Sequence, residues 1–107
     1  MVLSDTASNN SYDRVAFVLP IEAFIFDAAG ININASLDNT SEFSTVPRGQ
    51  NARNLTVTNS SFIGGFRGIS ASGEATTTFA EGLRVENSVF IGQDDEGISA
   101  QFYDTVE

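Results

Sequence analysis

The sequence of 107 residues contains no cysteine, no histidine and no lysine. Without cysteine, the chain has no disulfide bond, no thiol nucleophile and no thiolate ligand for a metal ion. The lack of histidine and lysine removes further side chains on which enzymes commonly rely for proton transfer. These absences favour a non-catalytic protein.

Positive charge is scarce, since five arginines stand against fourteen acidic residues and give a net charge of −9. A duplex nucleic acid is therefore an unfavourable partner, because binding phosphates requires clustered positive charge. An anionic membrane surface is disfavoured for the same reason. Such acidity fits a protein from salty or calcium-rich surroundings, and it equally fits ordinary charge that keeps a protein soluble.

Long apolar runs and targeting segments are also lacking. The longest apolar stretch, residues 15–26, is interrupted by Pro20 and Glu22 and is too short to span a bilayer, so we expect no membrane insertion. Residues 1–13 are polar and show neither the basic nor the apolar region of a signal peptide. We interpret them as a lead-in to a single domain at 14–107.

What the sequence does contain is an internal repeat. Residues 54–71 recur at 82–100 with one inserted residue, and eleven of the eighteen aligned positions are identical. A repeat of this period is typical of architectures in which each copy stacks on the next. The shared residues form three short runs, which are Leu55–Asn59, Phe62–Gly64 and Gly68–Ala71 in the first copy and Leu83–Asn87, Phe90–Gly92 and Gly97–Ala100 in the second.

These runs predict short β-strands that pair between the copies. Each run can lie beside its counterpart at the strand spacing of about 4.8 Å. Upstream, Val15, Phe17 and Leu19 alternate as in a buried strand, and residues 31–37 alternate between apolar and polar. Residues 20–30 fit either a strand or a short capping helix. Loop-like segments surround two further candidate strands, at 43–46 and at 76–79.

This pattern resembles the right-handed parallel β-helix, the fold of pectate lyases, polygalacturonases and many bacterial surface proteins. The resemblance covers residues 54–103 through the motif L-x-V-x-N-S-x-F followed by G-I-S, and it extends more loosely to 22–37, where residues 24–26 and 30–33 echo the second and third runs. It implies an all-β solenoid of about three coils, with a short N-terminal helix as an optional cap. Structural roles are then expected for six shared residues: a buried hydrogen-bonded ladder of Asn59 and Asn87, and core columns of Phe62 with Phe90 and Ile69 with Ile98.

The positions where the two copies differ are the candidates for chemistry. Asp94, Asp95 and Glu96 lie at the corner between the second and third runs of the second copy. They are solvated loop acids, or ligands of Ca²⁺, or, by resemblance to polygalacturonases, a catalytic pair at Asp94 and Asp95. The first copy carries Arg67 at the equivalent corner, so we expect Arg67 to pair with Asp94 or Asp95.

A second candidate surface is the outward face of the first run. Arg84 and Glu86 point outward there, opposite Thr56 and Thr58 of the preceding copy. Together with Arg67 they are candidates for binding a sugar or a protein surface, and a plain solvated face is the alternative.

A short stack leaves backbone groups unpaired at both ends, so we expect the chain either to belong to a longer β-helix or to be capped by neighbouring chains. The leading hypothesis is a non-catalytic structural or adhesive module of an extracellular or cell-surface protein, which self-associates or joins the remainder of a longer chain. The alternative is a fragment of a carbohydrate-active enzyme, a polysaccharide lyase or a glycoside hydrolase, with a glycan as its ligand. No cofactor is expected apart from Ca²⁺ at the acidic corner.

Overall fold

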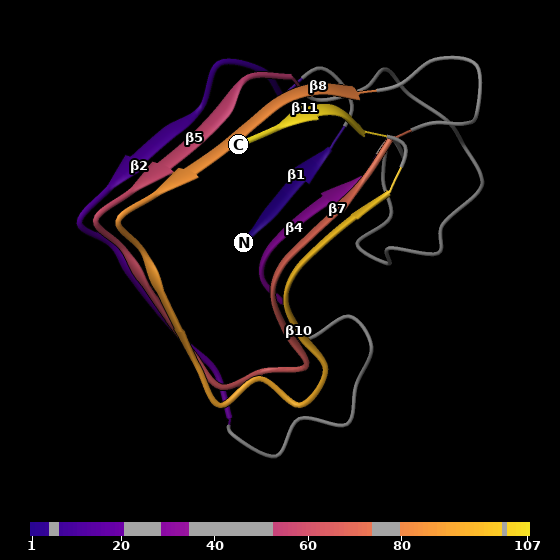
Figure 1. The fold of residues 1–107 in the computed structure, drawn as a ribbon. Helices are drawn as coiled ribbons and strands as arrows, with labels where there is room; N and C mark the ends of the chain where they lie inside the picture. The colour runs from indigo at the N-terminus through magenta and orange to yellow at the C-terminus, as the bar shows by residue number, and fades with distance from the viewer. Residues whose placement is uncertain (5–6, 21–28, 35–52, 74–79, 102) are drawn as a thin grey trace.

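The computed structural model describes residues 1–4, 7–20, 29–34, 53–73, 80–101 and 103–107, and this part of the chain is all-β. Within these ranges no helix is long and apolar enough to cross a membrane. The strands form three sheets in which all neighbouring strands are parallel (Figure 1). Sheet 1 consists of β1 (Val2–Ser4), β4 (Ala29–Asn34), β7 (Arg67–Ser72) and β10 (Glu96–Gln101). Sheet 2 consists of β2 (Ser11–Asp13), β5 (Leu55–Thr58), β8 (Ala80–Glu86) and β11 (Tyr103–Val106), and sheet 3 of β3 (Ala16–Val18), β6 (Ser61–Ile63) and β9 (Val89–Ile91).

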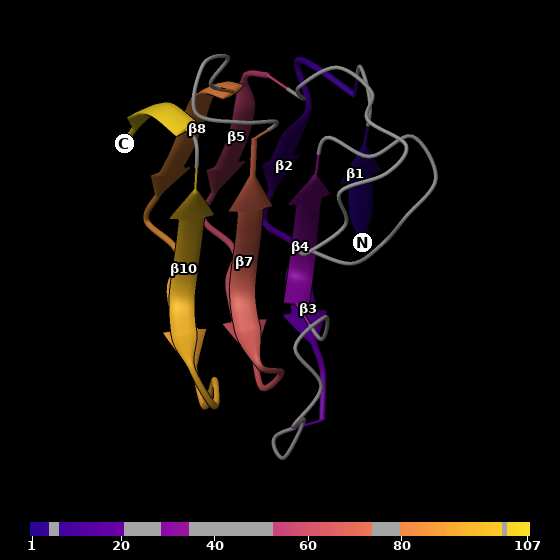
Figure 2. The same ribbon diagram turned by 90° about the vertical axis from the view of Figure 1, so that its right-hand side faces the viewer.

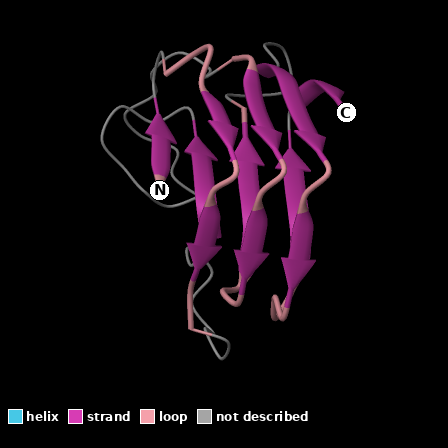
Figure 3. Ribbon diagram, turned by 90° about the vertical axis from the view of Figure 1, so that its left-hand side faces the viewer, coloured by secondary structure: helices cyan, strands magenta, loops and turns pink. Residues whose placement is uncertain are grey.

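Three successive stretches of the chain each contribute one strand to every sheet. We call them the first unit (β2, β3 and β4), the second unit (β5, β6 and β7) and the third unit (β8, β9 and β10). Strand β1 extends sheet 1 beyond the first unit, and β11 extends sheet 2 beyond the third. Figure 2 shows the strands of sheet 1 side by side in this order, and Figure 3 shows the short turns that lead from sheet 2 to sheet 3.

The pairing between the second and third units confirms the register that the repeat predicts. Each of the three runs lies beside its own counterpart, so that like residues stand next to like residues in all three sheets. The paired positions include Leu55 with Leu83, Phe62 with Phe90 and Ile69 with Ile98. The repeat therefore sets the strand register of this part of the molecule.

The first unit differs from the sequence-based interpretation in two places. Residues 1–13 contain β1 and β2, so the segment interpreted as a lead-in supplies a strand to sheet 1 and another to sheet 2. The second run of this unit is β3, whose Phe17 pairs with Phe62. Residues 24–26, which the sequence analysis compared with the second run, lie outside the described ranges. The third run is confirmed, because Ile31 pairs with Ile69. Residues 21–28, 43–46 and 76–79 lie outside the described ranges.

Three phenylalanine rings run through the core from unit to unit. Phe17 and Phe62 stack with their centroids 4.7 Å apart and 11° between the ring planes, and Phe62 and Phe90 stack at 4.8 Å and 4°. These separations match the spacing of neighbouring strands, because equivalent positions in parallel strands repeat at that distance. Phe62 is fully buried between the other two rings. Burying a side chain of this size stabilises the folded state by roughly 1.5–3 kcal/mol.

A column of glycines in sheet 1 makes room for these rings. Gly68 lies beneath the Phe90 ring of the next unit, where an added Cβ would come within 2.4 Å of Cδ1 of that ring and 2.6 Å of the Gly97 carbonyl oxygen. Gly30 stands in the same relation to Phe62. At Gly30 and Gly68 a glycine is therefore needed, because a larger residue would collide with the phenylalanine ring of the following unit.

The corners between the strands are formed by residues with left-handed backbone conformations. One column has φ values between 56° and 75°: Asn9 and Asn54 precede β2 and β5, whereas Gly82 and Thr105 lie inside β8 and β11. Asparagine adopts this conformation more readily than most residues. The Nδ2 group of Asn54 donates to Oδ1 of Asn9 over 3.0 Å, so an asparagine stack does occur, at a corner where the sequence did not predict it.

The glycine column provides a matched pair of substitutions. We expect Gly68→Ala to lower the free energy of unfolding by about 1–3 kcal/mol, because the added Cβ overlaps both a ring and a backbone oxygen. Gly97→Ala should cost clearly less, since its Cβ would meet the Phe90 ring at 3.3 Å or more. Urea denaturation of the two variants measures the difference. Equal losses of stability would contradict this account of the column.

Candidate functional site

The predicted acidic corner lies between β9 and β10, next to the arginine of the preceding unit. Arg67 donates from Nε to Oδ2 of Asp95 over 2.9 Å, and its Nη2 lies 2.9 Å from the same oxygen. Its Nε also lies 3.6 Å from Oε2 of Glu96. The Arg67 side chain is only 12 % exposed, and its guanidinium carbon lies 5.3 Å from the centre of the Phe66 ring. The predicted pairing of Arg67 with Asp95 is confirmed.

The residue inserted in the second copy is absorbed at this corner. The offset between paired residues is 28 from β6 to β9 and 29 from β7 to β10. The backbone keeps hydrogen bonds to the second unit across the insertion, with Asp94 N–H donating to the Gly65 carbonyl at 3.1 Å and Asp95 N–H to the Phe66 carbonyl at 3.0 Å. The Gln93 side chain reaches back to carbonyl oxygens of the second unit as well. The corner is therefore tied to the strand below it on both sides of the insertion.

Arg67 restricts what this corner can do chemically. An ion pair with partly exposed carboxylates contributes about 0.2–1 kcal/mol, so it fixes the local register more than it stabilises the fold. Among the residues that the structure describes, no three acidic side chains come together as a metal-binding group. Ca²⁺ binding at Asp94, Asp95 and Glu96 stays a prediction, and an ion there would have to compete with Arg67 for Asp95. The catalytic role of Asp94 and Asp95 stays a prediction too.

The outward face of sheet 2 carries the second predicted surface. Arg84 forms an ion pair with Glu86 on the same strand, and both side chains are exposed. The hydrogen bond to Glu86 raises the pKa of Arg84, so this guanidinium stays charged. A shallow hollow of about 190 Å³ lies beside Arg84, between Thr56 of β5 and Thr105 of β11. The structure thus brings Arg84 and Glu86 together, whereas Arg67 belongs to the separate acidic corner.

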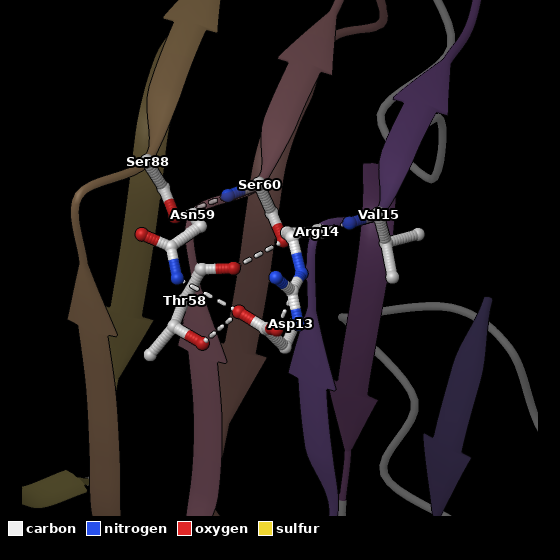
Figure 4. A network of polar contacts seen from close by, with 7 residues as sticks. All are labelled: Asp13, Arg14, Val15, Thr58, Asn59, Ser60 and Ser88. Atoms are coloured by element: carbon white, nitrogen blue, oxygen red, sulfur yellow. Dashed lines mark hydrogen bonds and ion pairs between the residues drawn. The ribbon is translucent and has the colours of Figure 1, made fainter.

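A polar cluster that the sequence analysis missed lies where sheet 2 turns into sheet 3 (Figure 4). Oδ1 of Asp13 accepts hydrogen bonds from Thr58 Oγ1 at 2.9 Å and from Asn59 Nδ2 at 2.8 Å, and its Oδ2 lies 2.9 Å from Arg14 Nε. The bonds from Asn59 and Thr58 hold the pKa of Asp13 below its usual value. Aligning S-Y-D-R-V of the first unit with T-V-T-N-S of the second would have predicted this cluster, because it places Asp13 beside Thr58 and next to Asn59.

The same corner contains a serine ladder in place of the predicted asparagine ladder. Backbone N–H of Val15 donates to Ser60 Oγ at 3.2 Å, and that of Ser60 donates to Ser88 Oγ at 3.1 Å, as Figure 4 shows. Asn59 and Asn87 are exposed and have φ values of 50° and 47°. The prediction that they form a buried ladder is wrong, because a left-handed residue at this corner directs its side chain outward. The hydrogen bonds of this corner join the first unit to the second and the second unit to the third.

A third surface is the uncovered side of the third unit. Ile98 is 37 % exposed although its counterpart Ile69 is fully buried, and Ala100 is exposed although Ala71 is buried. In the described part of the chain β10 is the last strand of sheet 1, so these inward positions have a neighbouring strand on one side only. In sheet 2 the outer neighbour of β8 is β11, where burial raises the pKa of Tyr103 to about 12.

No protein-family model matches this chain, and neither a curated protein nor a solved structure matches it. The parallel three-sheet arrangement is compatible with the β-helix that the sequence resembles.

The Asp13 cluster predicts a measurable effect on a pKa. Thr58→Val removes one of the two donors to Oδ1 at nearly constant volume, so the pKa of Asp13 should rise toward its usual value. Thr56→Val is the matched control, because Thr56 lies on the same outward face of β5 and has no contact with Asp13 in the cluster described. A titration of the Asp13 carboxyl carbon by NMR compares the variants, and equal pKa values in all three proteins would contradict the assignment.

The lowered pKa also sets the direction of a pH effect on stability. Ionised Asp13 accepts its hydrogen bonds only in the folded state, so its contribution to stability is present above the pKa of the unfolded chain. It is lost as the pH falls through the lowered pKa of the folded state. The loss between these two pH values should therefore be smaller in Thr58→Val than in the unmodified protein.

Proposed function

We propose that this chain is a right-handed parallel β-helix and acts as a non-catalytic structural or adhesive module of an extracellular or cell-surface protein. Three sheets of parallel strands, filled by one strand from each successive unit, support a helical path of the chain. The core columns of Phe17, Phe62 and Phe90 support it too, because they require equivalent positions to stand directly above one another. In such a stack the side surfaces and the ends are what other molecules meet.

The observation that carries the proposal is the uncovered side of the third unit. Ile98 of β10 and Val106 of β11, the strand that follows the third unit, are 37 % and 48 % exposed, while Ile69 and Leu83, their neighbours in register, are fully buried. Exposed strand edges with apolar inward residues readily pair with further strands. Further β-structure laid alongside these strands, whether from another copy or from more of the same chain, would bury both side chains.

The acidic residues of the third unit fit a structural role better than a catalytic one. Asp95 is held by Arg67 in the pairing that aligns β7 with β10. Asp94 and Asp95 both use their backbone N–H groups to tie the corner to the second unit. The same acids oppose the approach of a second copy through this end, because like charges would meet.

The proposal is tested by the state of association and by turnover. Sedimentation velocity over a range of protein concentrations should show reversible association that strengthens at high salt, where repulsion between the acidic ends is screened. Ile98→Asp should weaken this association. Val18→Asp is the control, because Val18 is also apolar and, at 67 %, more exposed than Ile98, but lies on β3 of the first unit.

A screen of polysaccharides, with and without Ca²⁺, should show no turnover. A monomer at every concentration and salt level, together with turnover that disappears in Asp94→Asn or Asp95→Asn, would overturn the proposed function. Ca²⁺-dependent association that Asp95→Ala abolishes would locate the cation at the acidic corner and would leave the structural role in place.

A further inference from the structure

We propose that the hollow on the outward face of sheet 2 binds one neutral sugar ring through the carboxamide of Asn54, the hydroxyl of Thr56 and the guanidinium of Arg84. This inference rests on the proposed function, because it names a ligand for the adhesive module. The hollow has a volume of about 190 Å³, and around Gly82 it is bordered by Asn54, Thr56, Arg84, Thr105 and Glu107.

Three adjacent strands form the hollow. Strand β8 lies in the middle, with β5 on one side and β11 on the other (Figure 1). On β8, Gly82 lies in register between Asn54 and Thr105. Two positions further along, Arg84 lies beside Thr56 of β5. Both walls therefore belong to strands that are present in the structure, whatever lies beyond β11.

The glycine at position 82 leaves one step of a side-chain column empty. The preceding steps are Asn9 and Asn54, and Nδ2 of Asn54 donates to Oδ1 of Asn9 over 3.0 Å. Oδ1 of Asn54 is turned toward Gly82, where an added Cβ would lie 2.5 Å from this oxygen. Among the residues that the structure describes, no hydrogen bond reaches it. A ligand hydroxyl above Gly82 would donate to this oxygen, as the amide of a third asparagine would.

The other polar groups of the hollow suit a ring that carries several hydroxyl groups. Thr56 and Thr105 each offer a hydroxyl that both donates and accepts, whereas Arg84 offers donors only. A sugar hydroxyl also donates and accepts, so one ring can satisfy Asn54 on one side and Arg84 on the other. The hollow, at about 190 Å³, is smaller than the pockets of about 300–1,000 Å³ that hold drug-sized ligands, so it suits a single ring.

Charge favours a neutral sugar over an acidic one. Arg84 is already paired with Glu86 on the same strand. The hydrogen bond and the charge of Glu86 raise the pKa of Arg84, and the charge of Glu107 adds to this. One guanidinium thus stands among two carboxylates, in a protein whose net charge is −9. A uronate would be repelled there, whereas a neutral ring can accept hydrogen bonds from the guanidinium without repulsion.

A titration followed by NMR tests the site. The probes are the methyl glycosides of glucose, galactose and mannose, each added to ¹⁵N-labelled protein up to high millimolar concentration. At least one of them should shift the amide resonances of residues 54–56 and 82–84 in a saturable way. Glucuronate and glycerol are the control ligands, since the first adds a negative charge and the second has hydroxyl groups but no ring. Shifts of equal size with glycerol, or no shift with any of the three glycosides, would overturn the inference.

Two threonines of β5 test the contact from the side of the protein. Thr56→Val removes a hydroxyl of the hollow at nearly constant volume and should weaken binding of the glycoside about three- to tenfold, because one neutral hydrogen bond is lost. Thr58→Val makes the same change two positions along the strand, outside the hollow, and should leave the affinity unchanged. If Thr56→Val binds as tightly as Thr58→Val, the hydroxyl does not contact the sugar and the inference is wrong.

A third variant closes the hollow. Gly82→Asn fills the empty step with a residue that tolerates the φ of 75° at this position, and it should abolish binding. Its Cβ has to displace the Asn54 carboxamide, so the amide spectrum of the variant first shows whether it is folded. If it is not, the two threonine variants decide.

The outcomes separate this inference from the proposed function. Absence of sugar binding overturns the inference alone and leaves the structural module to its own test by association. Cleavage of a polysaccharide would instead overturn the proposed function, whether or not a sugar binds in the hollow.

Discussion

The structure depends on one constraint, which is that parallel strands place equivalent residues of successive units beside one another at the strand spacing. Once this register holds, each side chain must pack against its own counterpart. Phenylalanine satisfies the constraint by stacking in the Phe17, Phe62 and Phe90 column. Glycine satisfies it by leaving room at Gly30 and Gly68 for the ring of the next unit. Serine satisfies it through the Ser60 and Ser88 ladder.

The constraint is relaxed only at the corners, and there the units differ. The inserted residue of the third unit changes the register offset between β9 and β10 without disturbing either strand pair. Corner side chains bind one another across units, Asn59 with Asp13 and Arg67 with Asp95. Repeated residues therefore build the stack, and unlike residues at the corners determine what its surface presents.

Much of the second and third units could be predicted, because eleven identical positions fix three strands and their register together. The first unit could not, since Phe17 is the only residue of its first two strands that recurs at the equivalent positions. In sequence, the apolar residues at 24–26 resemble the second run as well as Ala16–Val18 do, and only the pairing of Phe17 with Phe62 identifies β3 as the strand of sheet 3. The Asn59 side chain was misplaced for a related reason, because alternation along the strand ends where the backbone turns left-handed.

The sequence by itself determined the strand periodicity, the pairing of like with like and the ion pair between Arg67 and the acidic corner. These features follow from the spacing of the apolar residues and from the charges, both of which are properties of the sequence itself. Only the tertiary structure decided which residues lie at an end. Ile69 and Ile98 are identical in type and in local sequence, yet one is buried and the other is exposed. Burial depends on whether a further strand lies alongside, and no local pattern contains that information.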